Sequence, residues 1–272
     1  MNVFGKKVGF IGAGNMASAL ISGIINAGFK PENITASSPG KDQLDSLSDT
    51  FGINTFTDND HVFNESEIII FAVKPHIMNT VLEEFSKNTS LKKVLIISVA
   101  AGLKIKDIEA HILPKQRIIR AMPNTPSSIG KGVTAISKNI NTTAADEEHA
   151  RELFSCVGKV INIEEEEMDL YTALIGSGPA YVFYLIESLL ESSSHMKIDK
   201  KIQKDMIASM ISGSAELALI SDNSPQELRE NVTSPGGVTE RAIEEFHKND
   251  LKKIILNAIK EAVNKSKELG EN

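Results

Sequence analysis

The segment Gly12-Ala13-Gly14-Asn15-Met16-Ala17 has the composition of a turn that binds a dinucleotide. It follows the apolar run Val8-Gly9-Phe10-Ile11 and opens a stretch with helical spacing of apolar residues. In such a turn the first two glycines permit a close approach to a pyrophosphate, which the helix N-terminus then binds. Ala17 occupies the third glycine position, an accepted variant. The pattern predicts a dinucleotide site, and its alternative is a tight turn without a ligand.

The residues after the second predicted strand distinguish NADPH from NADH. An acidic residue there usually holds the 2′-hydroxyl of the NAD ribose, and residues 33–41 contain no acid. Ser37, Ser38 and Lys41 could donate hydrogen bonds to the 2′-phosphate of NADPH, or could form the turn and cap of the next helix. The sequence therefore favours NADPH, with NADH as the alternative.

Two further segments follow predicted strands, whose C-terminal ends line the ligand crevice of an open α/β sheet. Ala72-Val73-Lys74-Pro75 ends a strongly apolar strand, and Pro75 suits the first turn of a helix. Residues 121–126 include two prolines, which would fix a loop and could place Asn124 near the nicotinamide. The alternative for Lys74 is a surface lysine at the start of a helix, and the alternative for residues 121–126 is a rigid turn without a ligand.

Two segments of the second half are unusual for packing alone. Residues 176–181, Gly-Ser-Gly-Pro-Ala-Tyr, interrupt an otherwise apolar helix. Proline costs roughly 3 kcal/mol inside a helix and glycine up to about 1 kcal/mol, so another contact must compensate. Residues 233–239, Thr-Ser-Pro-Gly-Gly-Val-Thr, precede a helix and offer backbone N–H groups to a small anion. Close helix packing and an interhelical turn are the simpler interpretations.

The elements that position these segments divide the chain into two domains. Strands are predicted over residues 8–11, 34–36, 68–73, 94–99, 118–119 and 133–136, with helices at 16–27 and 41–48. Such apolar runs are typical of a parallel sheet covered on both faces. Beyond Glu164 we expect helices only, over residues 168–191, 200–220, 225–231, 238–246 and 251–269. We predict an α/β Rossmann-type domain (1–163) followed by an all-α domain (164–272).

Composition excludes several classes of function. The 272 residues include 29 basic and 36 acidic side chains, a net charge of −7 that argues against nucleic acid or an anionic membrane as partner. The single cysteine excludes an internal disulfide and a cysteine-rich metal site, so we expect no metal and a cytoplasmic location. We expect no membrane helix, because no uninterrupted apolar stretch approaches about 20 residues. Residues 164–167 are all glutamate, which suits a helix start better than a cation site.

These motifs together resemble those of the pyrroline-5-carboxylate reductases. The shared segments are residues 9–14, 72–75, 123–126, 176–181 and 234–237, in this order. Many reductases share the glycine turn, whereas the last two segments are specific to this family. The resemblance covers nearly the whole chain. It implies reduction of the cyclic imine 1-pyrroline-5-carboxylate to L-proline by NAD(P)H, the last step of proline biosynthesis. It also implies a helical domain that forms homodimers, which often assemble into decamers.

The resemblance also implies site residues. Those for the coenzyme are Ile11, Gly12, Ala13, Gly14, Asn15, Met16, Ser37, Ser38, Asn59, Ala72, Val73, Lys74, Pro75 and Ala101, to which the loop analysis adds Asn124. Those for the substrate are Glu165, Asn231, Ser234, Gly236, Gly237, Val238 and Thr239. Glu165 is placed only by its spacing ahead of Gly176. Ile175 stands where some relatives have serine, which puts a polar contact there in doubt.

Imine reduction requires positioning, a dry site and a proton at the ring nitrogen, but no nucleophile or metal. Thr239 is the candidate catalytic residue, as the hydroxyl that hydrogen-bonds this nitrogen. A β-hydroxy-acid dehydrogenase is the main alternative. It would need a base in the first long helix of the second domain, and no Lys, Arg or His lies between residues 160 and 194. A non-catalytic dinucleotide-binding regulator would leave segments 176–181 and 233–239 unexplained.

Overall fold

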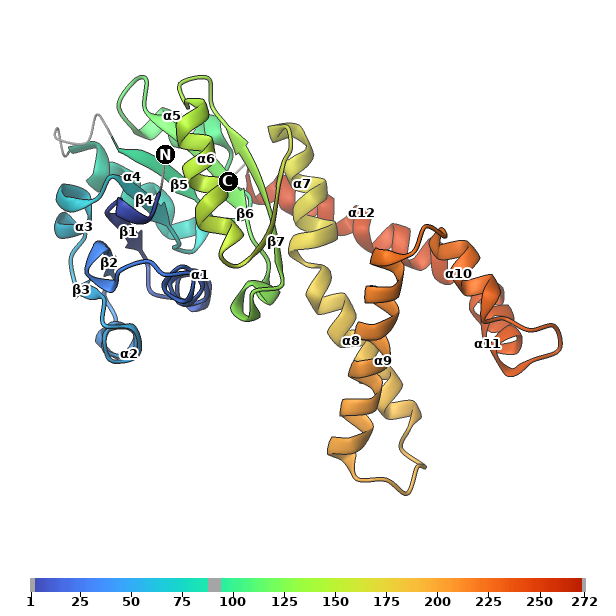
Figure 1. Cartoon of the computed structure of the whole chain (residues 1–272). Coiled ribbons are helices and arrows are strands. Elements are labelled where there is room, and N and C mark those ends of the chain that lie inside the picture. The colour runs from blue at the N-terminus through green and yellow to red at the C-terminus, as the bar shows by residue number, and fades with distance from the viewer. Residues whose placement is uncertain (1–2, 88–93, 271–272) are drawn as a thin grey trace. The chain divides into compact units, whose positions relative to one another are not determined.

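An eight-stranded sheet forms the centre of the N-terminal part of the computed structural model, which describes residues 3–87 and 94–270 (Figure 1). The strand order is β3-β2-β1-β4-β5-β6-β7-β8. The chain continues in opposite directions across the sheet from β1, so β1 and β4 flank a topological switch point. The bounds are β1 (Val8–Ile11), β2 (Ile34–Ser37), β3 (Asn54–Phe56), β4 (Ile68–Phe71), β5 (Leu95–Ser98), β6 (Arg117–Met122), β7 (Gly132–Lys138) and β8 (Gly158–Asn162).

The sheet is parallel except where β7 pairs antiparallel with β6. The expectation of a parallel sheet is wrong at this pair. Residues 123–131 connect the two strands, and a parallel crossover needs about a dozen residues or more. A short 3-10 helix, Thr125–Ile129, turns the chain instead. The loop containing Asn124 therefore starts at the same edge of the sheet as the coenzyme turn.

Helices cover both faces of the sheet (Figure 1). One face packs against α1 (Asn15–Asn26), α2 (Lys41–Phe51) and α6 (Ala144–Ser155). The other face packs against α3 (Asp60–Glu65), α4 (Pro75–Lys87) and α5 (Ile105–His111). This arrangement confirms the predicted strand runs, because both faces of each central strand are buried. Strands β3 and β8 were not predicted, since their residues are exposed or half-buried and form no apolar run.

The second half is helical, as predicted. Its helices are α7 (Met168–Tyr171), α8 (Gly178–Ser192), α9 (Lys200–Ile220), α10 (Pro225–Asn231), α11 (Val238–Lys248) and α12 (Leu251–Leu269). Side chains cap two of them: Asp199 accepts from the N–H of Lys201 before α9, and Ser224 accepts from that of Glu227 in α10. The acidic run forms a 3-10 turn, Glu165–Glu167, directly before α7, which agrees with the helix-start interpretation.

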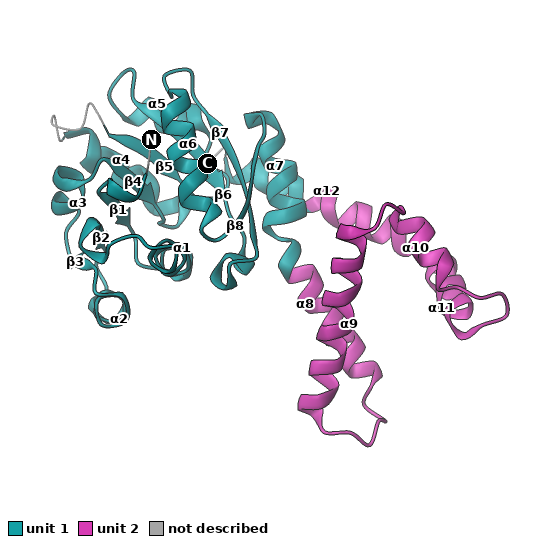
Figure 2. Ribbon diagram, in the orientation of Figure 1, with its two compact units in different colours: residues 1–179, 262–272 teal, residues 180–261 magenta. Residues whose placement is uncertain are grey.

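The chain divides into two compact units (Figure 2). We call Met1–Pro179 with Ala262–Asn272 the sheet unit, and Ala180–Glu261 the helical unit. This division does not coincide with the predicted domain boundary at residue 163. Residues 164–179 lie in the sheet unit because Met168 and Tyr171 pack against Ala135 of β7. The end of α12 joins them there, since the Ser266 hydroxyl donates to Asp169 Oδ1 at 2.7 Å.

The loop after β6 compensates for the proline within residues 176–181. Residues Thr172–Gly176 form a π-helical turn, in which the N–H of Ser177 donates to Thr172 O at 2.8 Å. Pro179 has no N–H, so Ile175 O lacks its usual donor four residues later. Asn124 Nδ2 donates to that oxygen at 3.2 Å, while Asn124 Oδ1 accepts from the N–H of Val133 at 2.9 Å. The Asn124 amide thus replaces the donor that Pro179 removes.

We therefore predict that Asn124→Ala lowers the free energy of unfolding by about 1–3 kcal/mol, because two partly buried backbone groups lose a partner. Pro179→Ala should recover part of this loss in the double variant, since it restores an N–H opposite Ile175 O. Chemical unfolding of the four proteins of this cycle measures the coupling. Strictly additive effects of the two substitutions would show that Asn124 does not replace the missing donor.

Candidate active site

A pocket of about 730 Å³ lies at the C-terminal ends of β1, β2 and β4, the predicted place for a coenzyme. Ten of the predicted coenzyme residues line it: Ile11, Gly12, Ala13, Gly14, Ser37, Ser38, Asn59, Ala72, Val73 and Lys74. The predicted residues Asn15, Met16, Pro75, Ala101 and Asn124 are not among the lining residues. Asn15 and Met16 begin α1, and Pro75 begins α4, so these three lie within two residues of a lining residue.

The turn after β1 has the geometry that a pyrophosphate requires. Gly12 has φ of 103°, and a Cβ there would lie 2.6 Å from the carbonyl oxygen of Ala72. Gly14 precedes α1, and a Cβ on it would meet no atom within 4 Å. The absent side chain therefore leaves open space at the helix N-terminus, where no acidic residue stands in the first turn. An anion placed there would meet backbone N–H groups and the positive end of the helix dipole.

The end of β2 carries a chain of hydrogen-bonded side chains. The Ser37 hydroxyl, fully buried, donates to Asn59 Oδ1 at 2.7 Å, and Asn59 Nδ2 donates to Glu84 Oε2 at 2.8 Å. The Ser37 hydroxyl is thus engaged with Asn59. The Ser38 hydroxyl oxygen accepts only a long bond, 3.5 Å, from the N–H of Gly40. Ser38 is the better placed of the two serines to meet a phosphate, and Lys41 is not among the lining residues.

Acidic residues that sequence analysis missed also line this pocket. Asp58 and Asp60 follow β3, and Glu84 lies on α4. A hydrogen bond from His61 lowers the pKa of Asp58, which keeps this carboxyl ionised. Lys74 and His76 are the basic side chains of the lining. The signal for Asp58 and Asp60 in the sequence is the run Asp58-Asn59-Asp60, whose last residue begins α3.

Glu165 lies in the sheet unit, in contact with a buried arginine. Its Oε1 accepts from Arg120 Nη1 at 2.9 Å and from the backbone N–H of Ile105 at 3.1 Å. Arg120 is 1% exposed. Sequence analysis missed Arg120, which sits inside the strand segment Arg-Ile-Ile-Arg-Ala-Met of β6. A basic residue in a buried strand gives no local indication of its partner, here 45 residues away.

The predicted anion loop joins α10 to α11 in the helical unit. Its first predicted residue, Asn231, ends α10, and Gly236 has φ of 72°. The N–H of Gly236 donates to Glu240 Oε2 at 2.6 Å, and the N–H of Gly237 donates to Ser234 O at 2.9 Å. The expectation that these two groups are free is therefore wrong, because the turn closes on itself. Val238 and Thr239 begin α11, where N–H groups have no partner within the helix.

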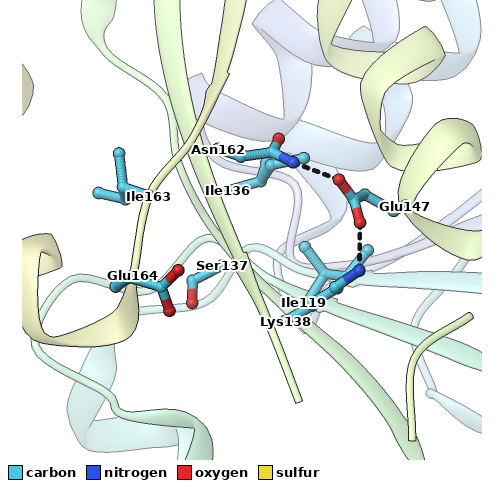
Figure 3. Close-up of a pocket in the computed structure, with 8 residues that line it drawn as sticks. All are labelled: Ile119, Ile136, Ser137, Lys138, Glu147, Asn162, Ile163 and Glu164. Carbon is cyan, nitrogen blue, oxygen red and sulfur yellow. Dashed lines mark hydrogen bonds and ion pairs between the residues drawn. The ribbon is translucent and has the colours of Figure 1, made fainter. Parts of the chain in front are cut away.

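A smaller pocket of about 280 Å³ lies beside the ends of β7 and β8 (Figure 3). Lys138 and Asn162 both point toward Glu147 and donate hydrogen bonds to its carboxylate. The bond from Lys138 lowers the pKa of Glu147. These three polar side chains bind one another, and the predicted site residues lie elsewhere. We therefore assign no ligand to this pocket.

Comparison with known proteins identifies the family. The family model described as pyrroline-5-carboxylate reductase dimerisation matches residues 165–269, and that described as NADP oxidoreductase coenzyme F420-dependent matches residues 7–102. The pyrroline-5-carboxylate reductase of Methanosarcina acetivorans is 38% identical over 267 residues, 98% of each chain. That of Arabidopsis thaliana is 34% identical over 98% of this chain and 96% of its own. The chain belongs to the pyrroline-5-carboxylate reductase family.

Solved structures of pyrroline-5-carboxylate reductases agree with this assignment. The Plasmodium falciparum enzyme with NADP bound has a TM-score of 0.89 and 34% identity, covering 97% of this chain and 98% of its own. The Coxiella burnetii enzyme also has a TM-score of 0.89, with 35% identity over 98% and 99%. The predicted fold class, the reduction of pyrroline-5-carboxylate in the last step of proline biosynthesis, and the NADP coenzyme are confirmed.

For this reductase we predict a higher kcat/KM with NADPH than with NADH. Removing both hydroxyls, in Ser37→Ala with Ser38→Ala, should reduce this preference, and Ser38→Ala should account for most of the effect. Asp58→Asn should raise the preference, because the extra phosphate of NADPH is repelled by a carboxylate in the same pocket. Ser46→Ala, on the exposed surface of α2, is the control. A tenfold preference for NADH, about 1.4 kcal/mol in the opposite direction, would contradict the prediction.

Proposed function

We propose that NADPH binds in the pocket at the ends of β1, β2 and β4 and transfers hydride to the C=N carbon of 1-pyrroline-5-carboxylate. The glycine turn after β1 carries this proposal, because Gly12 and Gly14 leave room for a pyrophosphate at the start of α1. When bound, the coenzyme supplies the hydride, and the chain supplies binding, orientation and a site from which water is excluded.

The substrate carboxylate is proposed to bind the loop before α11. The backbone N–H groups of Val238 and Thr239 are available at the start of this helix. The N–H of Gly236 donates a hydrogen bond to the carboxylate of Glu240, so this turn already binds one carboxylate. A Cβ on Gly237 would lie 2.9 Å from Ser234 O, so any larger side chain would distort the turn. Asn231, Ser234 and Gly236 complete this proposed site.

Protonation of the ring nitrogen makes the imine carbon a better hydride acceptor. Thr239 is proposed to hydrogen-bond this nitrogen through its hydroxyl. A threonine hydroxyl is too weak an acid to provide the proton at neutral pH, so the proton arrives on the substrate or through water. The role of the chain is then to orient the ring against the nicotinamide. Holding two reactants in the correct geometry removes a large part of the free-energy barrier to a bimolecular reaction.

Oxidation of NADPH with 1-pyrroline-5-carboxylate, measured beside a panel of β-hydroxy acids with NADP, tests the reaction. We predict activity with the imine and none with the β-hydroxy acids.

Thr239→Ala should lower kcat/KM about 5- to 150-fold, which corresponds to the loss of one hydrogen bond of ~1–3 kcal/mol. Gly237→Val should raise the KM of the imine steeply and leave NADPH affinity nearly unchanged. If Thr239→Ala had the same kinetics as the wild-type enzyme at saturating NADPH, the Thr239 hydroxyl would have no role in the reaction.

We further propose that the enzyme is a homodimer that assembles into larger oligomers. Helices α8, α10 and α11 contain no fully buried residue, and α9 buries only Gln203. Apolar side chains are exposed instead, among them Phe183, Met206, Met210 and Ile255. An isolated unit with this surface has no core of its own, and a second copy can supply one.

The same apolar surface explains an unexpected property of residues Glu165–Ser192. This run is long and apolar enough to cross a membrane by length and composition, and 6% of its apolar window is buried. Asp169 and Glu187 interrupt the run, so the expectation of no membrane helix stays a prediction. Its first turns pack on the sheet through Met168 and Tyr171, which a lipid-embedded helix would not do. We propose a soluble cytoplasmic enzyme in which the partner subunit covers this surface.

Light scattering across a concentration series tests the assembly. We predict that the native enzyme stays dimeric or larger, and that Met206→Asp with Met210→Asp yields smaller and inactive species, because a charge buried without a partner is costly. Ile140→Asp is the matched control, since Ile140 is an apolar side chain of the sheet unit that is 97% exposed. A monomer at every concentration, with full activity, would contradict the proposal.

A further inference from the structure

An ion pair between the buried Arg120 and the partly buried Glu165 connects the middle of the sheet to the loop between β5 and α5. Arg120 on β6 donates from Nη1 to Glu165 Oε1, and the same oxygen accepts the N–H of Ile105. Ile105 is the first residue of α5, so this bond fixes the point at which residues 99–104 end. The loop begins beside the coenzyme pocket, because the N–H of Val99 donates to Phe71 O at 3.1 Å and Ala72 lines the pocket.

The same loop is held at its middle by the last turn of α12. Gly102 has φ of 79°, and a Cβ on it would lie 2.8 Å from Leu269 Cβ. A Cβ on Gly270 would lie 2.5 Å from Gly102 O. These approaches are possible only because both residues are glycines. The loop that carries Ala101 is thus fixed at its centre by backbone contact and at its end by a carboxylate.

Stability alone gives a poor reason for the ion pair. Replacing a buried ion pair by well-packed apolar side chains is often neutral or stabilising. Among the described residues, Arg120 Nη2 and Glu165 Oε2 are both buried without a hydrogen-bond partner, which adds a desolvation cost. An apolar pair could not hold the loop in one position in this way. One oxygen of Glu165 accepts hydrogen bonds from a strand side chain and from a loop N–H together.

We infer that Arg120 is a positioning residue, which acts through Glu165 to hold residues 99–104 in the conformation that receives NADPH. This inference rests on the proposed function, in which NADPH occupies the pocket beside which this loop begins. It assigns Glu165 to the coenzyme loop rather than to the substrate contact that the family resemblance implies. The two roles of Glu165 make different predictions for coenzyme and imine affinity.

The test measures the Kd of NADPH by fluorescence titration without substrate, and the KM of the imine at saturating NADPH. We expect Arg120→Met and Glu165→Ala each to raise the Kd of NADPH about 3- to 10-fold, because the loop is held less firmly while its other contacts remain. The double variant should be no worse than either single variant, because both act through one contact. Glu165→Gln should retain most of the NADPH affinity, since its amide oxygen can still accept from Ile105.

Arg117→Gln is the matched control on the same strand. It breaks the ion pair of Arg117 with Asp146 on α6, at 2.6 Å. We expect a lower melting temperature and an unchanged Kd of NADPH. An equal rise of the Kd in this control would overturn the inference, because the effect would then be general destabilisation. So would a Glu165→Ala variant that raises the KM of the imine and keeps native NADPH affinity.

Gly102→Ala and the wild-type enzyme provide two further tests of the loop. If Arg120→Met does not fold, Gly102→Ala disturbs the same loop from the α12 side and should also raise the Kd of NADPH, while native affinity would overturn the inference. Native NADPH affinity in Arg120→Met and Glu165→Ala, with an active wild-type enzyme, would likewise overturn the inference alone. A wild-type protein that fails to bind NADPH or to reduce the imine would instead remove the proposed function.

Discussion

The close approach of β1 to the end of β4 is the constraint on which the coenzyme pocket depends. The Ala72 carbonyl occupies the space that a side chain at position 12 would need, so the turn after β1 passes directly over the switch point of the sheet. This places Gly14 and the start of α1 at the pocket. A bulkier residue at position 12 would displace the turn, and with it the N–H groups proposed to bind the pyrophosphate.

Backbone N–H groups at helix starts serve both proposed anion sites, and this choice fits the charge of the chain. The coenzyme pocket contains Asp58, Asp60 and Glu84 as well as Lys74. The loop before α11 already binds the carboxylate of Glu240. Because N–H groups carry no net charge, such sites bind anions without strongly basic surfaces. The net charge of −7 is therefore compatible with an enzyme proposed to bind a phosphorylated coenzyme and a carboxylate substrate.

Several loops and turns in the sheet unit are fixed by single polar side chains that satisfy backbone groups far along the chain. Asn124 supplies the donor that Pro179 cannot provide, and Glu165 accepts the N–H that begins α5. Ser266 ties the end of α12 to Asp169. The polar contacts thus hold segments in register where the apolar core does not reach. The helical unit lacks such a core altogether, which makes a second copy the proposed source of its packing.

The sequence alone determined the elements whose signal is local. Apolar runs, helical spacing, capping residues and the glycine turn depend on neighbouring residues, so the central strands, the helices of the second half and the coenzyme turn were predicted. Strands β3 and β8 were not predicted, because their residues form no apolar run. The strand β7 was predicted but its antiparallel direction was not, because that direction follows from the short connection after β6. Tertiary structure alone decided that Ser37 binds Asn59, that Arg120 binds Glu165 and that Glu240 binds the N–H of Gly236. In each case folding brings the two partners together, and residue type and local spacing do not determine which groups meet.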